Sequence, residues 1–184
     1  MHLLAAHRLT GILLSDLPAR WAHSQQVLSQ ARKLAPVVGS AREVLAVSAI
    51  LHDVGYASAA VDTGQHMIDG ARYLARLGCD PLVCSLVAYH SSSEWEAAEL
   101  GLAPALAEFE RPPSDLLDAI TFCDLTSGPG GALVDATSRL DEVLCRYAPD
   151  HVVHRAVSAA RPALLSMVAR VEERLAARPG GYPM

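Results

Sequence analysis

The chain has 184 residues, of which 51% are hydrophobic, and its formal net charge is −5 at pH 7. This length predicts a single domain over residues 1–184, with a core that can bury about two-thirds of the surface of the unfolded chain. The chain has one lysine, Lys33, and scattered arginines, so it lacks the basic cluster that a nucleic-acid polymer needs in a partner. No unbroken apolar run approaches the roughly twenty residues of a membrane span, which argues against a membrane partner.

The remaining features of the composition indicate a cytoplasmic protein. The Leu-rich segment 1–21 is interrupted by His7, Arg8 and Asp16 and shows no secretory-signal pattern, so we expect it to belong to the folded domain. The cysteines form no C-x-x-C pair and are expected to be reduced, small apolar residues. They are Cys79, Cys84, Cys123 and Cys145. The oligomeric state stays open.

Apolar residues recur with the 3.6-residue period of a helix along almost the whole chain, and no segment alternates as a strand would. The sequence therefore predicts an all-α bundle of about seven to eight helices. A first helix is expected from residue 18 to just before Pro36, because proline disfavours a continuing helix. A second is expected over 40–53, with Ser40 and Glu43 as a capping box and Gly55 as the break.

The later elements follow from similar signals of capping and termination. Helices are expected over 66–77, with Gly78 as the stop, and over 80–91, with Asp80 as the cap and Pro81 in the first turn. A more polar and broken helix is expected over 93–110, followed by a helix over 112–127 and a loop at 128–131. Helices over about 135–147 and 150–177 complete the domain, and the tail 178–184 is expected to be mobile.

Several ionisable residues fall near the ends of the predicted apolar stripes. His23 lies in phase with the apolar residues of its helix, and His52, Asp53, His90 and Asp124 do the same on three others. A buried carboxylate without a partner costs several kcal/mol. A divalent metal held by imidazoles and carboxylates would compensate all of these groups together. The pattern therefore favours a metal site where the helices meet.

The order of these residues, with His66 between His52-Asp53 and His90, resembles the HD-domain superfamily of metal-dependent phosphohydrolases. The resemblance extends over about residues 20–148 and includes the segments "LHDVG" and "HMIDGARYL". It implies one or two divalent ions per chain, with Fe, Mn, Co, Ni, Zn and Mg as the candidates. It further implies that His23, His52, Asp53 and Asp124 hold one ion, and that His66 and His90 hold a second with Asp53 as the bridge. His52 and Asp53 would then be the catalytic pair.

Two local features refine the resemblance. The short gap between Asp53 and His66 is similar to that of the small nucleotide hydrolases, such as the symmetrically cleaving diadenosine tetraphosphate hydrolases. The segments "DLTSGPGG" and "SRLDEVLCRY" resemble a group of small actinobacterial HD proteins. Many hydrolytic relatives have a lysine where this chain has Tyr56, so a phosphate would have to rely on the metals and on an arginine.

The sequence offers further candidates for substrate binding and for support of the ligands. Arg20 and Arg72, with Tyr56, are the predicted substrate-binding residues, and for each arginine the alternative is a solvated helix face. Asp62 and Asp69 flank His66 and would orient ligands or cap the helix. The pair His151 and His154 lies outside the pattern and is expected to have surface or capping roles.

The leading hypothesis is hydrolysis of a phosphoester of a small molecule, a nucleotide or small phosphomonoester, by metal-activated water. One alternative is a di-iron oxygenase, since some HD proteins with the same ligand order cleave C–C or C–P bonds with iron and oxygen. Another is a regulatory module that binds the metal without turnover, for which Tyr56 would be the distinguishing residue.

Overall fold

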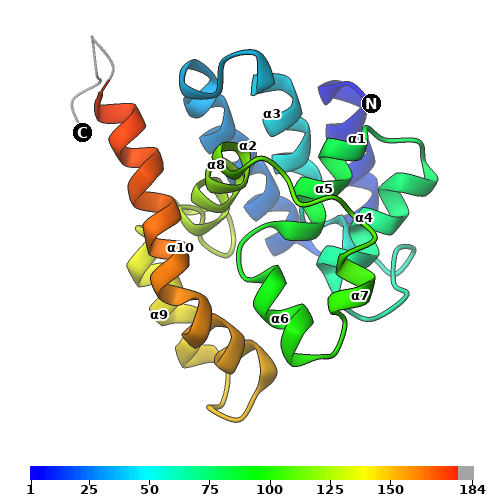
Figure 1. Cartoon of the computed structure of the whole chain (residues 1–184). Coiled ribbons are helices and arrows are strands. Elements are labelled where there is room, and N and C mark those ends of the chain that lie inside the picture. Colours follow the sequence, from blue (N-terminus) through cyan, green and yellow to red (C-terminus); the bar gives the residue numbers. More distant parts are fainter. Residues whose placement is uncertain (178–184) are drawn as a thin grey trace.

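The computed structural model describes residues 1–177, and within them ten α-helices and two short 3-10 turns form a bundle (Figure 1). Over this part of the chain an isolated bridge between Ser127 and Leu133 is the one β-type pairing. The predicted all-α class is confirmed. The number of helices exceeds the prediction because the N-terminal segment forms a helix of its own and segment 93–110 is split. The tail 178–184 lies outside the described residues.

Three long helices make the first half of the bundle: α1 (Leu3–Leu13), α2 (Pro18–Val38) and α3 (Arg42–Leu51). The prediction that the α2 helix ends before Pro36 is wrong, because Pro36 lies in its last turn and the helix continues to Val38. Proline has no N–H to donate, so Pro36 removes one hydrogen bond of the helix without ending it at that residue. The helix ends at Gly39, whose φ of 59° suits glycine.

The predicted capping box at Ser40 is not formed. Residues Gly39–Ala41 make the 3-10 turn η1, which runs directly into α3, and the N-cap residue Ala41 has no side-chain hydrogen bond. The turn supplies backbone structure before α3, so the first turn of this helix needs no side-chain cap. Ser40 is an exposed residue of that turn.

Helix α3 is the centre of the core. It packs against α1, α2, α5 and α8, and each residue from Leu45 to Leu51 is buried. A helix that is apolar on all sides requires neighbours on all sides, which explains the unbroken run "AVSAIL". The segment Pro18–Tyr56 is long and apolar enough, by length and composition, to cross a membrane. In the structure it is folded back into α2 and α3, which pack against each other.

A close backbone contact fixes the chain after α3. The 3-10 turn η2 (Val54–Tyr56) packs on α4 (His66–Arg76). A Cβ atom on Gly55 would lie 1.9 Å from the carbonyl oxygen of His66 and 2.6 Å from the nitrogen of Gly70. Only glycine permits this approach, and it sets the start of α4 beside the end of α3.

The remaining helices surround this core. Helix α5 (Pro81–Tyr89) begins as predicted, with the Asp80 carboxylate accepting from the Leu82 N–H. The expected break is confirmed, because α6 (Ser93–Glu99) and α7 (Ala103–Leu106) are separate helices. Helix α8 (Ser114–Leu125) packs on α2 and α3. Helices α9 (Ala136–Arg146) and α10 (Val152–Ala176) lie together along one side of the bundle (Figure 1).

Candidate metal centre

The six predicted metal ligands come together from five helices. His23 projects from the second turn of α2, His52 and Asp53 follow the end of α3, and His66 is the first residue of α4. His90 follows α5, and Asp124 lies in the last turn of α8. His23, His52, Asp53 and His90 are buried, whereas the side chains of His66 and Asp124 are 17% and 14% exposed.

Three imidazoles are oriented by backbone carbonyls. The Nδ1 of His52 lies 2.8 Å from the oxygen of Ala49, and that of His90 lies 2.7 Å from the oxygen of Val87. The Nδ1 of His23 lies 3.2 Å from the oxygen of Gly128. A carbonyl only accepts, so these contacts place a proton on Nδ1. In His52 and His90 the Nε2 lone pair is left to face the cluster, whereas the Nε2 of His23 donates to Asp124 Oδ1.

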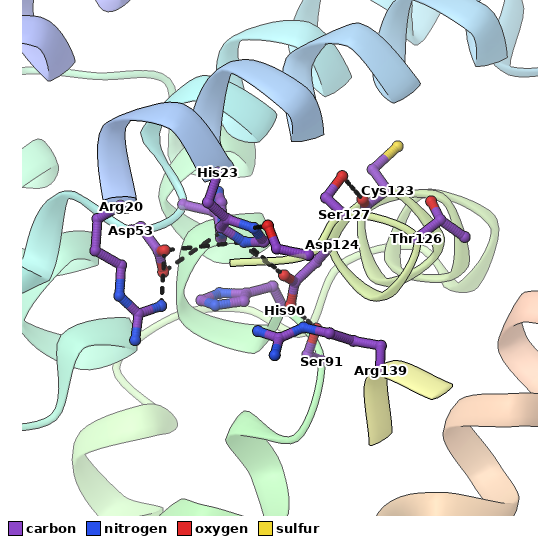
Figure 2. Close-up of polar contacts among 12 residues, drawn as sticks. Arg20, His23, Asp53, His90, Ser91, Cys123, Asp124, Thr126, Ser127 and Arg139 are labelled. Atoms are coloured by element: carbon purple, nitrogen blue, oxygen red, sulfur yellow. Dashed lines mark hydrogen bonds and ion pairs between the residues drawn. The ribbon is translucent and has the colours of Figure 1, made fainter. Parts of the chain in front are cut away.

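The first group of ligand atoms has the spacing of a single coordination sphere. The Nε2 of His23 lies 3.0 Å from Asp124 Oδ1 and 4.0 Å from Asp53 Oδ2. The Nε2 of His52 lies 3.5 Å from Asp53 Oδ1 and 3.9 Å from Asp124 Oδ1. Two ligand atoms each about 2.1 Å from one ion are about 3.0 to 3.4 Å apart at ordinary coordination angles. The four side chains can therefore close on one ion with small adjustments. Figure 2 shows three of them, His23, Asp53 and Asp124, gathered at one place.

A second group shares Asp53. The Nε2 atoms of His66 and His90 are 3.3 Å apart, and His66 Nε2 lies 3.7 Å from Asp53 Oδ1. The potential ligand atoms of Asp53, His66 and His90 all lie within 4.8 Å of one another, as do those of Asp53, His23 and His52. Asp53 is thus the residue common to both groups, which is the arrangement of a bridging carboxylate.

The chemistry of the donor atoms fits a bound cation. The Nε2 of His52 is buried and has no hydrogen-bond partner among the described residues. Burial lowers the pKa of His52 to about 4 and that of His66 to about 3, so both are neutral at pH 7. Neutral imidazoles with carboxylates suit Zn, Fe, Ni and Mn ions, and a cation would satisfy the unpartnered nitrogen.

The two carboxylates remain ionised despite their surroundings. Burial alone would raise their pKa values, but His52 and Arg20 hold the pKa of Asp53 well below its usual range. The hydrogen bond from His23 does the same for Asp124, and that contact raises the pKa of His23 against the effect of burial. The cluster therefore presents two negative charges to a metal.

Ser91 supports Asp124 and was not among the predicted site residues. Its hydroxyl makes a short hydrogen bond to Asp124 Oδ2, and its N–H lies 3.3 Å from Thr121 Oγ1. Ser91 has a φ of 52°, a left-handed conformation that is unfavourable for a residue with a side chain. This backbone conformation directs the Ser91 hydroxyl toward Asp124.

Arg20 and Tyr56 lie at the edge of the cluster. The Nη1 of Arg20 lies 3.1 Å from Asp53 Oδ2, and its Cζ lies 3.9 Å from the centre of the Tyr56 ring. That ring stacks on His66, with centroids 4.2 Å apart and an interplanar angle of 13°. Tyr56 therefore holds Arg20 and His66 in place through the faces of its ring.

The structure does not bring Arg72 to the cluster. Its guanidinium binds the carboxylates of Asp62 and Glu108 at 2.7 and 2.5 Å, outside the central pocket. The reason is its position on the face of α4 that points to segment 62–64 and residue 108. The buried Asp69 accepts hydrogen bonds from the N–H groups of residues 62–64 and so fixes the conformation of the loop before α4. His151 caps α10, as expected.

A pocket opens onto the cluster, and several of its lining residues were not predicted. Asp53, His66, His90 and Asp124 form its floor, with Arg20 and Tyr56 beside them. The residues that sequence reasoning missed are Ser91, Glu96, Arg139, Arg146 and Tyr147. Except for Ser91, which is adjacent to a predicted ligand, they carry no sequence signal, because only the packing of α6 and α9 brings them to the pocket.

Comparison with known families gives one match, to the HD domain over residues 20–127. This segment contains all six predicted ligands and ends before α9. The match gives no support for the actinobacterial subtype suggested by the resemblance. No curated protein and no solved structure gives a significant match to the chain.

Proposed function

The chain belongs to the HD-domain family, and we propose that it is a metal-dependent phosphohydrolase that acts on a small phosphoester. The observation that carries the proposal is the pair of ligand groups that share Asp53. His23, His52, Asp53 and Asp124 would hold one divalent ion. Asp53, His66 and His90 would hold a second. A bound ion there would lower the pKa of water and withdraw charge from the phosphoryl oxygens.

The reaction adds water to a phosphate ester. A water oxygen forms a bond to phosphorus, the ester P–O bond breaks, and the products are an alcohol and inorganic phosphate. The attacking water gives up a proton, and the leaving oxygen takes one. Within the described residues, Glu96 is the pocket-lining carboxylate outside the predicted ligand set. We assign it the role of accepting the proton of the attacking water.

Glu96 is placed for this role by α6. Its Oε1 accepts a hydrogen bond of 2.6 Å from the hydroxyl of Ser92, two residues after the predicted ligand His90. One carboxylate oxygen is thereby fixed and the other remains available to the pocket. The cytoplasmic location stays a prediction of the sequence, and the oligomeric state stays open.

The proposal is tested by metal analysis of protein purified without added metal, followed by assay of phosphate release from a panel of phosphomonoesters and nucleotides. We expect turnover with at least one divalent metal and none after Asp53→Ala. The control His154→Ala changes an exposed-face histidine of α10 and should retain full activity. Glu96→Gln should lower kcat by about a hundred-fold without loss of metal.

Absence of phosphate release with every metal would refute a hydrolase. Oxygen consumption by an iron-loaded form would then indicate the oxygenase alternative. Stable metal binding without either reaction would indicate the regulatory alternative.

A further inference from the structure

The wall of the pocket opposite the metal cluster comes from a part of the chain that the family match does not include. Helices α9 and α10 begin after residue 127, yet they contribute seven of the 19 lining residues. The polar ones are Arg139 and Arg146, and the apolar ones are Leu140, Val143, Val153, Val157 and Leu164. Features specific to this chain therefore decide what binds above the metals.

Arg139 is the less exposed of the two arginines in this wall. Its side chain is 10% exposed, and Figure 2 shows it extending from α9 toward His90 and Ser91. Within the described residues its guanidinium has one ion-pair partner, Glu142, through Nη1. A guanidinium carries five N–H donors in a planar fork that matches a phosphate. Most of these donors remain available for a ligand.

The charges around Arg139 leave an excess of positive charge. Glu142 binds both Arg139 and Arg146, so one carboxylate faces two guanidinium groups. Glu142 is not among the pocket-lining residues. Arg20, in contrast, is paired with Asp53 and lies over the Tyr56 ring. Arg139 is therefore the arginine best placed to meet an anion beside the metal ligands.

The size and polarity of the pocket limit the rest of the ligand. Its volume is about 110 Å³, whereas an engineered cavity that binds benzene has about 150 Å³ and the pockets of drug-sized ligands have about 300 Å³ or more. Apart from the two arginines, the lining side chains of α9 and α10 are aliphatic, and Tyr147 follows α9 at the pocket. A phosphate with a short apolar group fits this space, and a nucleoside would have to lie outside it.

We propose that Arg139 binds the phosphate group of the substrate, and that Glu142 and Arg146 hold the Arg139 side chain in position. Helices α9 and α10 then restrict the substrate to small phosphate monoesters with a short apolar group. This inference rests on the proposed phosphohydrolase function for the identity of the ligand. It is tested through binding, which requires no turnover.

The test is calorimetric titration of the manganese-loaded full chain with inorganic phosphate. We expect Arg139→Gln to weaken phosphate binding at least ten-fold, and Arg139→Lys, which keeps the charge but loses the planar fork, to fall between the two. The matched control is Arg161→Gln, which removes the same charge from an arginine of α10 paired with Asp141 outside the pocket. It should bind phosphate as the wild type does.

Metal content and the unfolding midpoint of each variant are measured in parallel. If Arg139→Gln fails to fold, the Arg139→Lys titration decides, with an expected weakening of at least three-fold. Wild-type phosphate affinity in a folded, fully metal-loaded Arg139 variant would overturn the proposal. That result would leave the hydrolase proposal standing, because the latter fails only if the wild type releases no phosphate from any ester.

The size restriction has its own titration. Binding of ethylphosphonate is compared with binding of the phosphonate analogue of adenosine monophosphate. Both have a P–C bond in place of the ester P–O bond, so the proposed hydrolysis cannot consume them during the titration. We expect the small ligand to bind at least ten-fold more tightly. Equal or tighter binding of the nucleoside analogue would overturn the assignment of α9 and α10 as a size filter.

Discussion

At the scale of single residues, the site depends on how each ligand is held. His23, His52 and His90 each use one ring nitrogen on a backbone carbonyl, which leaves the other for the cluster. Asp124 accepts a hydrogen bond from the Ser91 hydroxyl, and Asp53 accepts one from the Arg20 guanidinium. Such supporting contacts fix ligand orientation and raise metal affinity.

Tyr56 illustrates a residue whose role the structure clarifies. Its ring stacks on His66 and underlies Arg20. We expect Tyr56→Phe to retain metal affinity and turnover within about two-fold, because the ring contacts persist. Tyr56→Ala should weaken the metal held by His66 and His90 by about ten-fold, the scale found when supporting residues of a ligand are lost.

Metal titration and steady-state assays check this prediction. A loss of turnover in Tyr56→Phe as large as that in Tyr56→Ala would show that the hydroxyl contacts the substrate, as the sequence suggested.

The buried imidazoles predict a dependence of stability on pH in the metal-free protein. His52 and His66 have pKa values of about 4 and about 3 in the folded chain, and about 6.5 when unfolded. Between pH 7 and 5 the unfolded chain therefore binds more protons at these two residues, and the free energy of unfolding falls as the pH falls. His23, whose pKa is raised, has the opposite effect on the free energy of unfolding. Because two residues lower that free energy and one raises it as the pH falls, we expect a net loss of stability from pH 7 to pH 5.

Urea unfolding with a chelator present, at pH 7, 6 and 5, measures this effect. The dependence should be shallower in His66→Gln. Stability that rises steadily from pH 7 to 5 would contradict the neutral state of the two imidazoles.

At the scale of helices, the sequence predicted most elements but not all of their ends. Asp80 with Pro81 and the glycine stop at Gly78 gave correct boundaries, since these signals act locally. The signals at Pro36 and Ser40 were misleading, because α2 continues to Val38 and the 3-10 turn that follows leads directly into α3 without a side-chain cap. Local signals lose their value where two helices are joined without a loop.

The attachment of α10 gives a prediction at this scale. The buried Asp118 of α8 binds Arg170 at 2.6 Å and Arg174 at 2.9 Å, and these two arginines lie one turn apart on α10. Asp118→Asn should lower the free energy of unfolding by about 1 to 2 kcal/mol, since both arginines are partly exposed and screened by water. The melting temperature would fall by about 5 °C for a chain of this size.

The matched control is Asp141→Asn, which breaks a more exposed pair with Arg161. It should change stability by less than about 0.5 kcal/mol. Hydrogen exchange should show the loss of protection in α10 for Asp118→Asn alone. Equal stability of the two variants would show that the pair does not hold α10 to the bundle.

At the scale of the whole molecule, the cluster of His and Asp side chains was predictable and the wall of the pocket formed by α9 and α10 was not. Five of the six predicted ligands lie in phase with an apolar stripe, and such stripes face the core, which is why the convergence of His23, Asp53 and Asp124 could be inferred. Arg139 and Glu96 lie on helices whose orientation depends on tertiary packing. Arg72 could not be placed for the same reason, because its helix face is decided by contacts with residues distant in the sequence.

Convergence of five helices on one centre predicts that metal stabilises the fold. Removal of metal with a chelator should lower the melting temperature by about 5 to 10 °C if metal is present at about a hundred times its dissociation constant, since this concentration contributes about 2.7 kcal/mol. Differential scanning calorimetry before and after removal measures the shift. Restoration by added metal is the control, and an unchanged melting temperature after verified removal would contradict the shared anchor.

The central claim, that Asp53 bridges two metal positions, is tested most directly by the metal content of the wild type, His90→Ala and Asp53→Ala prepared in parallel. Elemental analysis should give about two ions per chain for the wild type, about one for His90→Ala and close to none for Asp53→Ala. The expected order follows from the two ligand groups, because Asp53 belongs to both and His90 to one. Metal content in Asp53→Ala equal to that of the wild type would contradict the account.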